Sequence, residues 1–144
     1  MVANIAGPIW GLTPKTSVVT FVNADGTTKK TLVTAGANGC RVLSISATTS
    51  DTAANDVNLY VQALGAGTIG NIGGKRVPLA SGDVVASTVA GVNLLDTGQM
   101  PFLLPDGSLQ LAGGGGGTDL LQAGVVAAVT AGKTLTLVTQ YTDY

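Results

Sequence analysis

Few residues of this 144-residue chain have the chemistry that catalysis needs. It contains no histidine, which removes the commonest general base and the commonest transition-metal ligand. Its one cysteine, Cys40, stands beside Arg41, whose charge could stabilise a thiolate, but a small buried hydrophobic side chain is the expected role. A single cysteine also excludes an intramolecular disulfide and a multi-cysteine metal site. We therefore predict no catalytic residue, no cofactor and no metal.

Two glycine motifs superficially match phosphate-binding loops. Residues 65–70 read G-x-G-x-x-G, but a dinucleotide site needs a helix to open at the last glycine, and residues 71–78 carry two further glycines and a proline. Residues 132–134 read Gly-Lys-Thr, like the end of a P-loop, but Ala127 stands where the leading glycine belongs. Both matches are expected to be coincidental.

The aspartates give no clear site either. Five of them stand singly in turns, where a carboxylate normally accepts backbone N–H bonds. They are Asp51, Asp56, Asp83, Asp96 and Asp106. The alternative is a calcium site assembled by the fold, although no dense run of acidic ligands is present. An enzyme of this composition would have to be a carboxylate-based hydrolase, and no pair of acids stands out for that role.

The chain is unusually poor in charge. Charged residues make up 10% of it, with seven basic and eight acidic side chains and a net charge of −1. An average soluble domain has about 25%. A surface of neutral polar residues loses little solvation energy when a partner covers it. Such a composition favours a protein that is permanently packed against neighbours.

The same composition argues against several partners. Basic residues cluster only at Lys29-Lys30 and Lys75-Arg76, too few for a phosphate-binding face, so we expect no nucleic-acid partner. No apolar stretch reaches the roughly 20 residues that span a bilayer, and no membrane association is expected. The N-terminus lacks the features of a secretory signal, which fits synthesis in the cytoplasm.

The elements that would position these residues are strands, because apolar residues recur with a period of two. In residues 56–63, Val57, Leu59 and Val61 are expected to face the core. In residues 41–48, the same alternation places Leu43, Ile45 and Ala47 on one face and Val42, Ser44 and Ser46 on the other. The turn formers of residues 49–55 predict a hairpin between these two strands.

Turn signals recur every 8 to 12 residues along the rest of the chain. Asp25-Gly26 predicts a turn into a return strand, Pro105-Asp106-Gly107 predicts a hairpin turn, and residues 65–74 and 113–117 are expected to be glycine-rich connections. Further strands are expected at residues 16–23, 28–35, 76–80, 83–88, 92–95, 103–104, 109–111, 125–129 and 134–141. A helix over residues 119–129 is the alternative there, but Gly124 and two valines argue against it.

This pattern predicts an all-β, single-domain β-sandwich with about eight to ten short antiparallel strands and a jelly-roll-like topology. Residues 16–144 would form the sandwich, and residues 1–15 an extended N-terminal arm. The arm carries Ile5, Pro8, Ile9 and Trp10. Trp10 either caps the domain's own core or anchors the arm on a neighbouring subunit, since buried tryptophan is enriched at interfaces.

One long segment resembles a known family. Residues 34–60 (TAGANGCRVLSISATTSDTAANDVNLY) are similar to a pattern of small virion proteins of tailed phages, A-x-x-N-G-x-R, then a strand, then T-x-(S/N)-D-T-x-x-N-x-V-x-L-Y. Residues 77–82, Leu94-Leu95, residues 103–107 and Asp143-Tyr144 follow in similar order and spacing. The likeness covers most of residues 31–144, and these motifs are turn and strand signatures without chemistry.

The resemblance implies a capsid decoration, or cement, protein of jelly-roll type that assembles as trimers or dimers on the outer surface of the virion. The expected role is to stabilise the capsid by bridging neighbouring major capsid subunits, with Ile5, Pro8, Ile9 and Trp10 as the expected capsid or subunit contact. A carbohydrate- or receptor-binding module of a head or tail fibre is the alternative function. An enzyme is not expected.

Overall fold

The computed structural model describes residues 13–63, 67–82, 90–114 and 117–144. These form nine strands and one short 3-10 turn, η1 (Asn23–Asp25). The strands are β1 (Thr13–Val22), β2 (Lys30–Thr34), β3 (Cys40–Thr49), β4 (Asn55–Gln62), β5 (Ile69–Val77), β6 (Val92–Asn93), β7 (Leu109–Leu111), β8 (Leu120–Val125) and β9 (Thr134–Asp143). No helix among the described residues has the length and apolar character needed to cross a membrane.

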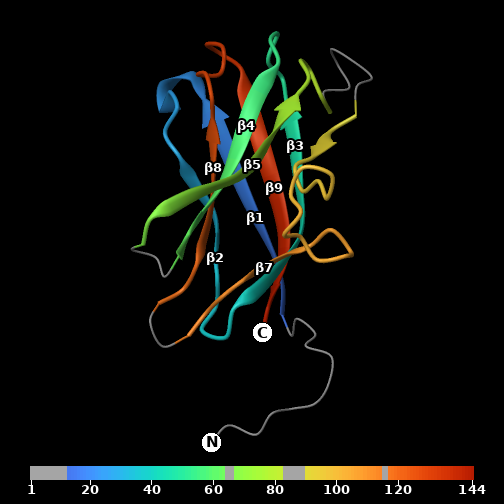
Figure 1. Cartoon of the computed structure of the whole chain (residues 1–144). Helices are drawn as coiled ribbons and strands as arrows, with labels where there is room; N and C mark the ends of the chain where they lie inside the picture. The colour runs from blue at the N-terminus through green and yellow to red at the C-terminus, as the bar shows by residue number, and fades with distance from the viewer. Residues whose placement is uncertain (1–12, 64–66, 83–89, 115–116) are drawn as a thin grey trace, which may run out of the picture.

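The strands form two antiparallel sheets that pack face to face as a sandwich (Figure 1). Sheet A has the order β1-β9-β3-β6, with β7 also paired to β3, and sheet B has the order β2-β8-β4-β5. The pairs β1/β9, β2/β8, β3/β7 and β4/β5 are nested in sequence, as in one long hairpin wrapped over itself. This is a jelly-roll topology, so the predicted fold class is confirmed.

The core lies between the sheets, where apolar side chains of period-two strands meet. Leu135 and Leu137 of β9 are fully buried, as is Leu59 of β4, and Val57 is only 1% exposed. The other large buried side chains are Phe21, Val33, Val42, Ile45, Leu94, Met100, Leu111 and Leu121. Burial of each such side chain contributes about 1.5–3 kcal/mol relative to exposure, so this layer holds the two sheets together.

The predicted hairpin between β3 and β4 is wrong. β3 pairs with β9 in sheet A, whereas β4 pairs with β8 and β5 in sheet B, so residues 50–54 cross between the sheets. The same applies to β2, which pairs with β8 rather than returning along β1. Polar turn formers suit a sheet-to-sheet crossing as well as a hairpin, so the residue types could not separate the two.

The predicted facing of β3 is wrong at two residues, Val42 and Leu43. A register shift between Val42 and Ser44 marks a β-bulge, which puts one extra residue into the strand. Val42 is therefore fully buried, together with Ile45 and Ala47, while Leu43 is 47% exposed. A strict period of two cannot pass through a bulge, so it predicts the wrong face for both Val42 and Leu43.

Other boundaries also differ from the prediction. β8 covers Leu120–Val125, ahead of the expected strand at residues 125–129, and no helix forms there. β5 occupies Ile69–Val77, most of which was expected to be a loop. Gly74 explains why this strand is glycine-rich: a Cβ there would lie 2.2 Å from Oδ1 of Asn58 on β4, so the two strands meet closely. The expected strand at residues 83–88 lies outside the described residues.

Candidate functional surface

The four residues predicted to make contacts, Ile5, Pro8, Ile9 and Trp10, lie outside the described residues. β1 begins at Thr13, so the last three residues of the segment expected as an arm lie in a strand of sheet A. The arm's role as a contact therefore stays a prediction.

Cys40 is a core residue at the start of β3. It is fully buried, and burial, followed by the nearby charges of Asp143 and Asp119, raises the pKa of its thiol to about 11. Arg41 does not stabilise the thiolate, because its guanidinium binds the carboxylate of Asp106 and its Nε donates to the Ser108 hydroxyl at 2.8 Å. Cys40 therefore stays a protonated thiol at neutral pH, as a structural residue would.

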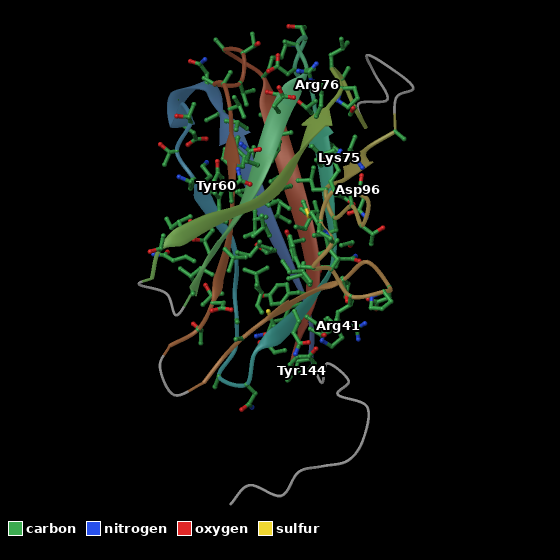
Figure 2. All side chains as sticks on the ribbon, viewed as in Figure 1. Arg41, Tyr60, Lys75, Arg76, Asp96 and Tyr144 are labelled. Atoms are coloured by element: carbon green, nitrogen blue, oxygen red, sulfur yellow. The ribbon has the colours of Figure 1, made fainter. Side chains whose placement is uncertain are left out.

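Most of the described aspartates are held in ion pairs. Asp25 pairs with Lys30 at 2.7 Å, Asp96 with Lys75 at 3.0 Å, and Asp143 with Lys15. Figure 2 shows the pair between Lys75 of β5 and Asp96 at one side of the sandwich. Within the described ranges, no group of three or more acidic or cysteine side chains is arranged to hold a metal ion. The expectation that the chain needs no metal remains a prediction.

Asp51 is different, because it is only 1% exposed and has no cationic partner among the described residues. It lies where the chain crosses from sheet A to sheet B. Its carboxylate accepts the N–H groups of Thr130 at 3.0 Å and Ala53 at 3.2 Å. Burial would raise its pKa, but hydrogen bonds from Thr130, Ala53 and Asn55 outweigh burial and lower the pKa to about 2. Asp51 is therefore a structural carboxylate that ties the crossing to the loop before β9.

The outer face of sheet A carries eleven residues without a formal charge, which we call the Ser/Thr/Val face. They are Thr16, Val18, Thr20 and Val22 of β1, Thr134, Thr136, Val138 and Gln140 of β9, and Ser44, Ser46 and Thr48 of β3. They form rungs across the three strands, with the hydroxyls of Thr20 and Thr136 3.3 Å apart. Arg41, bound to Asp106, lies beyond one end of this face (Figure 2).

This face has the properties of a surface that can be covered. Val18 is 62% exposed and Val22 is 37% exposed, and Leu43 at the bulge of β3 is a further exposed apolar side chain. Burying a hydroxyl costs far less than burying a charge once the hydroxyl has a hydrogen-bond partner, and hydroxyls can rotate to find one. Sequence reasoning predicted a neutral surface but did not locate it. The signal that could locate it is the alternation of Thr and Val at every second position of residues 16–22.

The outer face of sheet B is charged instead. Arg76 of β5 binds the carboxylate of Asp56 on β4 through two hydrogen bonds, of 2.8 and 3.0 Å. Lys29 lies over the ring of Tyr60, with its Nζ 4.6 Å from the ring centre. Covering this face would remove water from the Asp56–Arg76 ion pair and from the Lys29 ammonium, which is costly.

A shallow hollow adjoins one end of the Ser/Thr/Val face. Its lining is Thr48, Thr49, Ser50, Ser81, Gly82, Thr134 and Thr136. The hydroxyls could bind a polar group, but this lining contains no aromatic ring on which a sugar could stack. The hollow extends the uncharged character of the face rather than adding a separate chemistry.

Comparison with known proteins gives a limited likeness. No family model matches the chain, and no curated protein matches it. Among solved structures, a chain of the cyanophage Pam1 capsid asymmetric unit aligns with 99% of this chain and 95% of its own length, at 18% identity and a TM-score of 0.43. A likeness at this identity and TM-score does not carry a function from one chain to the other.

Proposed function

We propose that this chain is a structural virion protein that decorates a phage capsid and stabilises it by bridging neighbouring major capsid subunits. The observation that carries the proposal is the Ser/Thr/Val face, eleven uncharged residues on one side of a jelly-roll sandwich. The resemblance of residues 34–60 to small virion proteins of tailed phages supports the same role.

The mechanism is mechanical and uses no reaction. A symmetric oligomer that touches several capsid subunits gains a large effective concentration for each contact after the first. Individually weak contacts then resist expansion of the shell, because all of them must break together. A neutral face suits this task, since it can be covered without leaving a buried charge unpaired.

Purified protein added to mature capsids that lack it provides the test. The proposal predicts saturable binding at a fixed ratio to the major capsid protein, and a higher temperature of DNA release from decorated capsids. Failure to bind any tailed-phage capsid would contradict it. Glycan binding on an array, without capsid binding, would instead favour a carbohydrate- or receptor-binding module.

The predicted contact of the N-terminal segment can be tested separately. Removing residues 1–12 spares β1, which begins at Thr13, so the sandwich should remain folded. Reduced capsid occupancy by this truncated protein would support a contact through Ile5, Pro8, Ile9 and Trp10. Undiminished occupancy would rule that contact out and leave the sandwich itself as the binding surface.

A further inference from the structure

β1 is an edge strand of sheet A with an open side. It pairs with β9, and no other described strand pairs with it. In an antiparallel pair, alternate residues direct both backbone groups toward the partner, and the residues between them direct both groups away. The carbonyl of Thr20 accepts the ammonium of Lys30 at 2.7 Å, and the N–H of Val22 donates to Asp25 at 2.8 Å. The backbone N–H and C=O groups of the even-numbered residues of β1 therefore point away from β9.

These two contacts close one end of the edge, and a proline limits the other. Lys30 occupies the carbonyl of Thr20, Asp25 occupies the N–H of Val22, and Pro14 has no N–H to offer. Three donors and three acceptors remain along the edge without a partner among the described residues. The donors are the N–H groups of Thr16, Val18 and Thr20, and the acceptors are the carbonyls of Pro14, Thr16 and Val18.

This set is self-complementary. We propose that β1 of a second copy adds to this edge, antiparallel, about a two-fold axis at Ser17. Thr16 then lies opposite Val18 of the second copy, and the two exchange both hydrogen bonds. Thr20 lies opposite Pro14 of the second copy, so its N–H reaches the proline carbonyl. Every open group is used in this register, with six hydrogen bonds between the two strands.

The pairing of Thr20 with Pro14 is what selects this register. Proline cannot donate a hydrogen bond, and it faces the one carbonyl in the segment that Lys30 already satisfies. If the axis passed through Val18 instead, Thr16 would direct its N–H at that occupied carbonyl. The register about Ser17 therefore leaves no open donor without an acceptor, whereas its neighbour does.

The side chains permit this approach. Thr16, Val18 and Thr20 are exposed and uncharged, so two copies meet without like-charge repulsion at these positions. Lys15, the nearest charge on β1, is bound to Asp143. A long exposed edge is a template for another strand unless a charge, a bulge or a covering segment blocks it, and on this edge Lys30 and Asp25 block only the end at Thr20 and Val22. Pairing of the two β1 edges would join the two Ser/Thr/Val faces into one surface. This pairing rests on the proposed function and specifies the self-association that the function includes.

A cysteine cross-link tests the register. The two copies of Ser17 form a non-hydrogen-bonded pair on the axis, with Cα atoms about 4.5 Å apart, within the roughly 4.4–6.8 Å that a disulfide spans. Ser17→Cys should therefore give a disulfide-linked dimer under mild oxidation. Ser46→Cys, on the outer face of β3, is the matched control and should stay monomeric on a denaturing gel. Native Cys40 is buried and should not interfere.

Removal of a donor tests the hydrogen bonds. Val18→Pro deletes two of the six bonds, and proline is tolerated where an edge N–H faces outward. The dissociation constant of the dimer, measured by sedimentation equilibrium, should rise about tenfold or more, while the melting profile of the monomer persists. If the proline variant fails to fold, Val18→Lys replaces it. This variant keeps the N–H but adds like charges near the axis, so it should also weaken the dimer.

The outcomes separate this proposal from the proposed function, because neither assay contains capsids. A monomeric wild-type protein, or Ser17→Cys that cross-links no better than Ser46→Cys, would overturn the pairing. Such a protein could still bind capsids, and the decoration role would then stand. Efficient cross-linking at Ser17, lost in the Val18→Pro background, would establish it.

Discussion

The two outer faces of the sandwich differ in how they carry charge. Sheet A presents the Ser/Thr/Val face, whereas sheet B presents the Asp56–Arg76 pair and Lys29 over Tyr60. A covered charge costs several kcal/mol unless it finds a partner, but a covered threonine costs far less. The few charges of this chain thus leave one broad face that a partner can cover at little cost.

The sharpest way to break this contrast is to give sheet A a charge. Val138→Lys places an unpaired ammonium in the middle of the Ser/Thr/Val face and should weaken capsid binding by a hundredfold or more, or roughly 3–5 kcal/mol. Asn58→Lys, on the outer face of sheet B, is the matched control and should bind nearly normally. Co-sedimentation with capsids measures both, and equal losses would erase the distinction between the faces.

A second comparison separates the inner and outer sides of sheet A. Ile45→Ala should lower the free energy of unfolding by about 3 kcal/mol, because Ile45 is fully buried and its loss leaves a cavity. Leu43→Ala, two residues earlier at the exposed bulge, should change it by less than about 0.5 kcal/mol. Urea unfolding of both variants checks the assignment. A larger loss at Leu43 would show that the bulge is misplaced.

The bulge also shows what the sequence could and could not predict. The alternation in β4 correctly predicted that Val57 and Leu59 are buried, because the strand keeps a regular pleat there, while Val61 near its end is only half-buried. β3 begins with the same kind of alternation, but an extra residue at Leu43 breaks it. Nothing in the local residue types marks that insertion, which depends on pairing with β9, about a hundred residues away.

Long-range pairing likewise limited the prediction of the functional surface. Low charge and abundant threonine predicted a neutral surface, but its location depends on β1, β9 and β3 lying side by side. The turn formers of residues 49–55 predict a hairpin, which would put β3 beside β4 and disperse this face. The pairing partners, rather than the strands themselves, were the missing information.

The buried charge at the crossing between the sheets predicts a pH effect. The pKa of Asp51 is lowered from 3.8 to about 2 in the folded protein, so the ionised form stabilises the fold. The contribution, about 2 kcal/mol, is complete above pH 4 and is lost as the pH falls through 2. Urea unfolding at pH 5 and pH 2 should show this loss in the wild type and a smaller one in Asp51→Asn. Identical pH dependence in both would contradict it.

The smallest effect is expected on sheet B. Arg76→Gln removes the ion pair with Asp56, but the Arg76 side chain is 70% exposed and its charge is well solvated without a partner. We expect no measurable change in melting temperature or capsid binding. A clear loss of binding in this variant would show that sheet B, too, contacts the capsid.

Hydroxyl-radical footprinting of free and capsid-bound protein tests the central claim most directly. If the Ser/Thr/Val face is the covered surface, Val18, Val138 and the nearby Leu43 should become protected on the capsid. Tyr60 and Val126, away from this face, should react as in the free protein. Protection of Tyr60 and Val126 with unchanged reactivity at Val18 and Val138 would contradict the account.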